Sequence, residues 1–131
     1  VVSLPSLLVL KLFAWRDRRF DQPFKDAHDL NLIVSNYATA IGHERVFNAA
    51  GAIVAETGDP DLAGAWLAGF DMASVVSATV KKALLELLEA ETDEADKLSL
   101  AGDMAKSGKA VAPMVAMLIR IRDGLDSGER R

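Results

Sequence analysis

The sequence predicts an all-α protein, a compact bundle of six or seven helices. Apolar residues recur every three to four positions along most of the 131 residues, which is the period of a helix with one buried side. Strand-like alternation is absent, apart from a short VVSL start that fits an extended segment. Half of the residues are hydrophobic, so a chain of this length can bury a core as one domain, residues 1–131.

The first helix is expected to begin at Pro5 and Ser6, because proline is tolerated in the first turn of a helix. It continues through LLVLKLFAWRDRR and is apolar almost all round before Arg16. A helix without a polar side is buried on most sides. We therefore expect the first half of this helix inside the bundle.

Two further helices follow from cap and stop signals. Asp21 and Pro23 predict a cap and a first-turn proline for the second helix, and its apolar stripe runs on as far as Ile41. Gly42 is expected to end it, since glycine adopts the left-handed cap conformation without strain. A third helix should stop at Gly58, and its apolar stripe consists of Val46, Phe47, Ala50, Ile53 and Val54.

Asp59-Pro60 predicts the start of the fourth helix, because it joins a capping carboxylate to a proline at the first helical position. This helix is rich in small residues, namely Gly64, Ala65, Ala68 and Gly69. A glycine inside a helix costs about 1 kcal/mol relative to alanine, so two of them predict that another helix approaches closely. Trp66 and Phe70, four residues apart, are expected to anchor the core.

Ser77 or Thr79 predicts the start of a fifth helix. Its core face is expected to consist of Ala83, Leu84, Leu87 and Leu88. Thr92 and Asp93 are expected to cap a short helix that Gly108 breaks.

The last helix is expected over about residues 113–123. It carries Arg120 and Arg122 in its final turn, where cations are favourable against the helix dipole, and Gly124 is expected to close it. Four methionines read as core residues that fill gaps between helices; they are Met72, Met104, Met114 and Met117.

The composition excludes several functional classes. The chain has no cysteine, which rules out disulfides, thiolate catalysis and cysteine-ligated zinc and fits a reducing cytoplasm. It has two histidines and a net charge of −4, so we expect no protein metal site and no general attraction to nucleic acid. No stretch reaches transmembrane length, and the apolar start lacks the basic leader of a signal peptide, so we expect a cytoplasmic protein without a membrane segment.

The first helix places two cations on one face. Lys11 and Arg18 are seven residues apart, which is close to two helical turns. Lys11 is the only charged residue among the first fifteen. Its aliphatic side chain must therefore either extend along the apolar surface until the ammonium group reaches water, or place that group next to an anion. In the second reading the lysine ammonium contacts a phosphate as a compact charge, and the guanidinium group of a nearby arginine donates two parallel hydrogen bonds to the same phosphate.

Asp26 and Asp29 lie on one face at the start of the second helix. Carboxylates in a first turn are stabilised by the helix dipole and need no further role. In the functional reading they are metal ligands, or residues that position a base or a metal-bound phosphate. His28, between them, is expected to be exposed.

The segment LPSLLVLKLFAWRDRRFDQPFKDAHDLNLIVSNY resembles the segment just after the catalytic core in a family of bacterial nucleotidyltransferase-like proteins that includes the AbiEii-type toxins. The shared pattern is an apolar helix with an embedded lysine, then an arginine, then a (K/R)-D-x-x-D-L run. Here the lysine is Lys11, the run is residues 25–30, and the arginine is Arg16, Arg18 or Arg19.

A second stretch, DLAGAWLAGFDMA, resembles the A-G-x-x-L-x-G-R-D stretch of one branch of these proteins. Asp71 matches its aspartate, whereas Phe70 stands where that branch often has arginine.

The resemblance implies a nucleotidyltransferase whose N-terminal α/β domain holds Mg²⁺ and the nucleoside triphosphate. It implies that Lys11 contacts the triphosphate and that Asp26, with Asp29 second, is the late acidic residue of the catalytic site. The further phosphate-binding candidates are Arg16, Arg18 and Lys25.

The glycine-serine motif and acidic pair of that N-terminal domain do not occur in this sequence, which begins with valine. We therefore expect a C-terminal fragment that is inactive alone, holds no cofactor alone, and has the N-terminal domain as its partner. One alternative is a stand-alone helical interaction module without catalysis, a homodimer formed through the apolar N-terminus and the small-residue helix. Another is binding of an RNA acceptor through residues 16–25, where basic residues are mixed with acidic ones.

Overall fold

The computed structural model describes residues 3–93, 98–105 and 110–128, and over these ranges the chain forms eight helices and no strand. The all-α prediction is confirmed, with a helix count slightly above six or seven. The helices are α1 (Leu4–Arg18), α2 (Pro23–Ser35), α3 (Tyr37–Ile41), α4 (His43–Thr57), α5 (Pro60–Val75), α6 (Ala78–Thr92), α7 (Ser99–Ala105) and α8 (Val111–Ser127).

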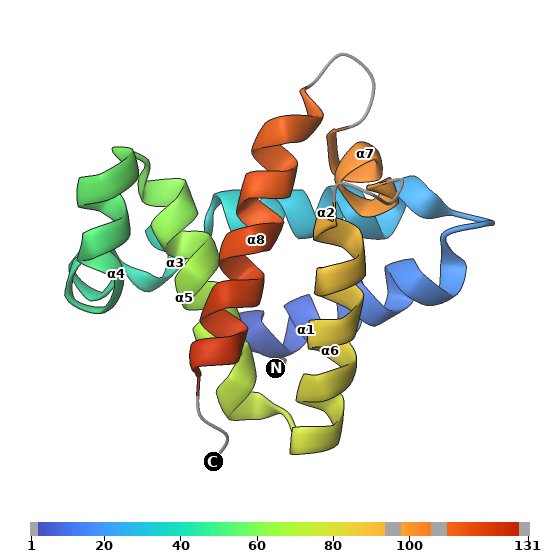
Figure 1. Ribbon diagram of the computed structural model, residues 1–131, viewed down its shortest axis with the longest axis horizontal. Helices are drawn as coiled ribbons and strands as arrows, with labels where there is room; N and C mark the ends of the chain where they lie inside the picture. The colour runs from blue at the N-terminus through green and yellow to red at the C-terminus, as the bar shows by residue number, and fades with distance from the viewer. Residues whose placement is uncertain (1–2, 94–97, 106–109, 129–131) are drawn as a thin grey trace.

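Helices α5 and α8 form the centre of the bundle. In Figure 1, α8 crosses the molecule beside α5 and α6, α3 and α4 lie at one end of the long axis, and the turn between α1 and α2 lies at the other. Within the described ranges, no helix combines the length and the hydropathy needed to cross a membrane.

Helix α1 begins as the sequence predicts, with proline in its first turn and the Ser3 hydroxyl accepting a hydrogen bond from the Ser6 amide at 3.3 Å. Leu8, Leu12 and Trp15 are buried, whereas Leu10 is 57% exposed. Helix α1 therefore buries one face, and the prediction that its first half is buried on most sides is only partly correct. Of the predicted extended start, residues 1–4, Ser3 is extended, Leu4 is already the first residue of α1, and residues 1–2 lie outside the described residues.

The expected second helix is divided into α2 and α3. Asn36 interrupts it with φ −107° and ψ 4°, and its side-chain amide donates to the Leu32 carbonyl at 2.7 Å. Such a bond competes with the helical backbone ladder. The prediction of Asp21 as the cap is wrong, because Gln22 occupies that position. Gly42 ends α3 at the predicted position, but with φ 98° and ψ 133° it does not adopt the predicted left-handed cap conformation.

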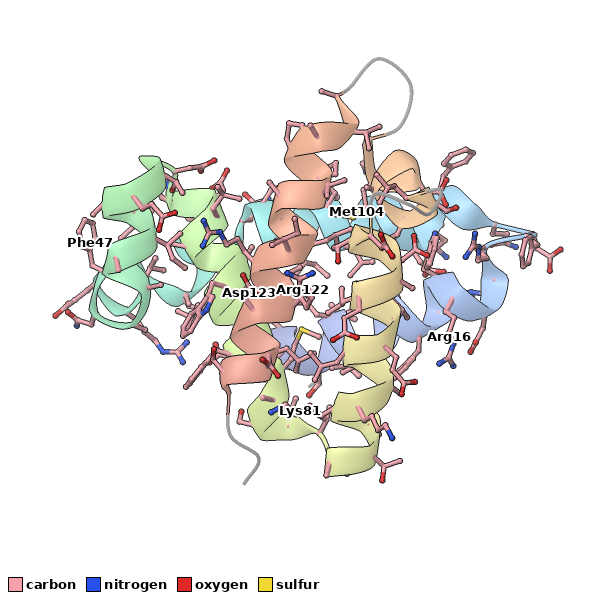
Figure 2. The ribbon with its side chains drawn as sticks, in the orientation of Figure 1. Arg16, Phe47, Lys81, Met104, Arg122 and Asp123 are labelled. Atoms are coloured by element: carbon pink, nitrogen blue, oxygen red, sulfur yellow. The ribbon has the colours of Figure 1, made fainter. Side chains whose placement is uncertain are left out.

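Helix α4 stops at Gly58, which has the predicted left-handed conformation with φ 69°. The prediction that Phe47 belongs to the buried stripe is wrong, because its side chain, labelled in Figure 2, is 64% exposed. Helix α4 lies at the edge of the molecule and buries only the narrow face that carries Val46 and Ala50. The rest of the apolar surface of α4, including Phe47, is therefore not fully covered by another helix.

Helix α5 starts at the predicted cap, where Asp59 accepts a hydrogen bond from the Asp61 amide at 2.9 Å. Its small residues are buried, as expected for a close helix contact. Two helices approach α5: a Cβ atom added at Gly69 would meet the backbone of Ile121 and Leu125 in α8, and one added at Gly64 would lie 3.1 Å from the Ala38 amide nitrogen in α3.

Gly124 does not close the last helix, contrary to the prediction. It lies inside α8, where an added Cβ would meet the backbone of Trp66 and Phe70. Helix α8 continues to Ser127, so the two arginines placed in its final turn lie earlier. Phe70 is about one-third exposed and stacks on Trp66 with ring centroids 5.2 Å apart, so this pair sits at the rim of the core.

Helix α6 starts at Ser77, whose hydroxyl accepts from the Val80 amide at 3.2 Å. Thr92 does not cap the next helix; it is the last residue of α6, is buried, and donates to the Leu88 carbonyl at 2.7 Å. The predicted break at Gly108 lies outside the described residues. Three of the four methionines are buried and Met114 is partly buried, in agreement with their predicted place in the core.

Candidate functional site

The candidate site is formed where α1 and α2 pack against each other in opposite directions. The amides of Asp21 and Gln22 both donate to the Arg18 carbonyl, at 3.0 and 2.8 Å. This tight turn reverses the chain directly after α1. The face of α1 that carries Lys11 and Arg18 therefore lies against the first turns of α2.

Four charged side chains meet at this junction. We call Lys11, Arg18, Asp26 and Asp29 the α1–α2 cluster. The Lys11 ammonium nitrogen lies 2.7 Å from Asp29 Oδ2 and 3.5 Å from Asp26 Oδ1. The Arg18 guanidinium donates through Nη2 to both oxygens of Asp26, at 2.8 and 2.9 Å, and through Nε to Oδ2 at 3.2 Å.

One carboxylate oxygen joins the two cations. Asp26 Oδ1 contacts both Lys11 Nζ and Arg18 Nη2, so the two positively charged groups are immediate neighbours. Two adjacent cations are an arrangement that can contact the oxygens of a polyphosphate. Two cations and two carboxylates sum to zero, however, so the cluster as a whole is electrically balanced.

The two aspartates differ sharply in burial. The Asp26 side chain is 0% exposed, whereas that of Asp29 is 34% exposed. Breaking a buried ion pair by removing one partner costs about 3–5 kcal/mol, because a charge is left buried and unpaired. A pair at the surface contributes only about 0.2–1 kcal/mol. Asp26 is therefore a fixed part of the fold, and the contact between Lys11 and Asp29 is the one that can open.

The hydrogen bond from Lys11 to Asp29 raises the pKa of the lysine above its ordinary value of 10.5, against the opposite effect of burial. The charges of both aspartates act in the same direction. Lys11 is therefore a stable cation near neutral pH. Its side chain is 21% exposed, so it has access to the solvent side of the cluster.

Two of the predicted phosphate-binding residues lie outside the cluster. Arg16, labelled in Figure 2, pairs with its neighbour Asp17 at 3.0 Å and stacks over the Phe13 ring at 4.6 Å. Lys25 is exposed on α2. The structure thus brings together Lys11, Arg18 and the aspartate pair, and separates Arg16 and Lys25 from them.

These residues do not by themselves form a metal site. Asp26 is fully enclosed by its two cationic partners, which leaves Asp29 as the partly exposed carboxylate of the cluster. Over residues 3–93, 98–105 and 110–128, no three or more acidic or histidine side chains are grouped to hold a metal ion. His28 is exposed on α2, as the sequence predicts.

A second cluster, which the sequence does not predict, joins α3, α4 and α5. Asp71 accepts a hydrogen bond from the Tyr37 hydroxyl at 2.6 Å and two from the Arg45 guanidinium at 2.6 and 2.8 Å. Burial and the neighbouring carboxylate raise the pKa of Tyr37 well above its ordinary value. We call these three residues the Asp71 cluster.

The sequence indicates individual residues of the Asp71 cluster but not the contacts between them. Tyr37 falls on a buried stripe, and a buried hydroxyl requires a partner. The resemblance singles out Asp71 as a matching aspartate, but nothing in the sequence pairs it with Tyr37, 34 residues away. The Asp71 carboxylate is fully engaged by three donors, so we interpret this cluster as a structural connection between helices.

Comparisons with protein-family models, curated proteins and solved structures found no match to this chain.

Proposed function

We propose that this chain is the helical part of a nucleotidyltransferase-like protein, in which Lys11 and Arg18 contact the polyphosphate of a nucleoside triphosphate. The observation that supports the proposal is the meeting of these two cations at one oxygen of Asp26. Phosphoryl transfer depends mainly on positioning and on neutralising charge at phosphate oxygens. Adjacent lysine and arginine side chains supply both.

The burial of Asp26 and Asp29 suggests different tasks for them. Asp26, fully buried and held by Arg18 and Lys11, acts as a positioning residue that holds both cations in place. Asp29, at the solvent edge, is the acidic residue that can face a bound substrate. Catalysis then requires a domain with the nucleotide- and Mg²⁺-binding motif, which we place outside these 131 residues, in a protein of the cytoplasm.

The test is a titration of the chain with tripolyphosphate, followed by the chemical shifts of backbone amides. We expect weak binding, with shifts concentrated at the junction of α1 and α2. The Lys11→Met change should weaken binding about tenfold, since a charge-assisted hydrogen bond contributes about 1.5–3 kcal/mol. Lys82→Met is the matched control, because Lys82 is an exposed lysine on α6.

Two results would contradict the proposal. One is the same tripolyphosphate affinity in Lys11→Met as in the unchanged chain. The other is a set of shifts centred on helices other than α1 and α2. In a longer protein that carries the catalytic motif, Lys11→Met should also abolish nucleotide transfer while Lys82→Met leaves it intact.

A helical interaction module is a second candidate, favoured by the exposure of large apolar side chains. Phe20 and Phe24 near the α1–α2 turn, Leu10 on α1 and Phe47 on α4 are each at least half exposed. The small residues of α5 are buried under α3 and α8, so a dimer would have to use the other surfaces. Sedimentation at several concentrations tests this candidate; a monomer at all of them would contradict it.

A further inference from the structure

We propose that the outer face of α2 binds a second copy of this chain, with the two α2 helices antiparallel around a two-fold axis at His28. The inference gives a surface and a partner to the helical interaction module, the second candidate function. It rests on that candidate and does not depend on phosphate binding by Lys11.

The outer face of α2 carries a stripe of exposed residues at helical spacing. Phe24 and Leu32 are 51% and 49% exposed, and His28 between them is exposed as well. Residues four apart advance by about 40° around a helix, so these three form one continuous stripe, which we call the α2 stripe. Phe20, in the turn before α2, is 89% exposed and adds apolar surface at this end of the helix. Large apolar side chains that gather on one face mark a contact surface, whereas scattered ones do not.

The α2 stripe is complementary to itself. Phe24 and Leu32 each lie about 6 Å from His28 along the helix axis, in opposite directions. A second α2 that runs the opposite way about a two-fold axis at His28 therefore places Phe24 against the partner's Leu32. The same contact occurs a second time on the other side of the axis. A two-fold interface requires a patch of this kind, in which the same residues serve both copies.

The charges beside the stripe favour the antiparallel arrangement. Lys25 and Asp29 are one turn apart on the same side of the stripe; Lys25 is exposed, and Asp29 is 34% exposed and contacts Lys11 through Oδ2, which leaves Oδ1 for a second cation. The two-fold rotation keeps this side of both helices together, so Lys25 and the partner's Asp29 differ by only about 3 Å along the axis. Two pairs of opposite charge therefore form. In a parallel pair the two charged sides would lie on opposite sides of the contact, and neither pair could form.

The centre of the contact is polar but need not stay unpaired. At the axis the two His28 rings meet, and one imidazole can donate an N–H to the free ring nitrogen of the other. The surface is small, because it consists of one face of a 13-residue helix and the turn before it. Interfaces below about 1,200 Å² belong to weak, exchanging complexes, so we expect a reversible dimer.

The first experiment is sedimentation velocity between about 10 µM and 1 mM, where the dimer fraction should rise with concentration. Phe24→Ser and Leu32→Ser should each weaken association at least about tenfold, because each change removes both symmetry-related contacts. Phe47→Ser is the matched control, since Phe47 is an equally exposed phenylalanine on another helix, α4; it should leave association unchanged. Circular dichroism checks that every variant keeps its helices.

A second experiment tests the register. The chain has no cysteine, so one introduced thiol reports on one position. Helix axes about 8–10 Å apart bring facing Cα atoms to roughly 4–6 Å, which is the separation that a disulfide requires. His28→Cys should therefore form a covalent dimer under mild oxidation at least about tenfold faster than His43→Cys, the control, which places the thiol at an exposed position on α4.

The outcomes separate this inference from the broader candidate. If Phe47→Ser weakens association as much as Phe24→Ser, the α2 stripe is not the interface, and the interaction module stands with another surface. Equal rates of cross-linking in His28→Cys and His43→Cys would overturn the register in the same way. A monomer at every concentration overturns both the inference and the interaction module, and assigns the α2 stripe to a different partner.

Discussion

The close contact between α5 and α8 predicts that replacing a helical glycine with alanine destabilises this protein, which is the opposite of the usual effect. Alanine normally stabilises the interior of a helix by about 1 kcal/mol relative to glycine. At Gly124 we expect the opposite, because the Cβ atom of an alanine would lie within 3.0 Å of the Trp66 carbonyl group. Both atoms of that group belong to the α5 backbone, so no side chain can move aside.

The size of the effect follows from what must move. To restore an ordinary contact of about 3.5 Å, the two backbones must separate by well over 1 Å, and close-packed interiors do not accept such a shift freely. Added atoms in a packed core cost about 1–3 kcal/mol, occasionally more. After subtracting the gain in helix propensity, we expect Gly124→Ala to lower the free energy of unfolding by about 2 kcal/mol.

The assay is urea unfolding followed by circular dichroism, with thermal unfolding as a second measurement. A loss of about 2 kcal/mol corresponds to a fall in Tm of about 8 °C for a chain of this size. Gly102→Ala in α7 is the matched control, because an added Cβ there meets nothing within 4 Å, and it should stabilise by up to about 1 kcal/mol. If Gly124→Ala is as stable as the unchanged chain, the close backbone contact between α5 and α8 is not present in solution.

Three further predictions follow from the two clusters and the surface. Asp26→Asn should destabilise the fold by about 3 kcal/mol, and Asp29→Asn by less than about 1 kcal/mol, in urea unfolding, because the Asp26 carboxylate is fully buried and accepts hydrogen bonds from the Arg18 guanidinium, whereas Asp29 is partly exposed; equal effects would contradict the burial argument. Burial and Asp71 raise the pKa of Tyr37 in the folded state. The stability that the protonated hydroxyl contributes is therefore complete below about pH 10 and is lost as the pH rises further. The free energy of unfolding should fall between about pH 10 and 11.5, and it should fall less steeply in the Tyr37→Phe variant. Phe47→Ser should change stability by no more than about 0.5 kcal/mol in thermal unfolding, since the ring is largely exposed, and a larger loss would place Phe47 in a packed environment.

The candidate site was partly accessible from the sequence. Helical spacing alone places Lys11 with Arg18 on one face and Asp26 with Asp29 on another, and the structure brings these two faces together. Spacing could not show that Asp26 is enclosed while Asp29 remains at the surface. The difference depends on how closely α2 packs on α1, and this decides which aspartate can respond to a ligand.

Local signals determined where most helices begin and which residues face the core. Asp59-Pro60 starts α5 because capping and proline geometry act within one helical turn, and the apolar period places Leu84 and Leu88 inside α6 for the same local reason. Only the tertiary structure decided what glycine does at position 124. A glycine that ends a helix and one that admits a neighbouring backbone look the same in sequence. The backbone that distinguishes them at position 124 is that of Trp66 and Phe70 in α5, more than 50 residues earlier in the chain.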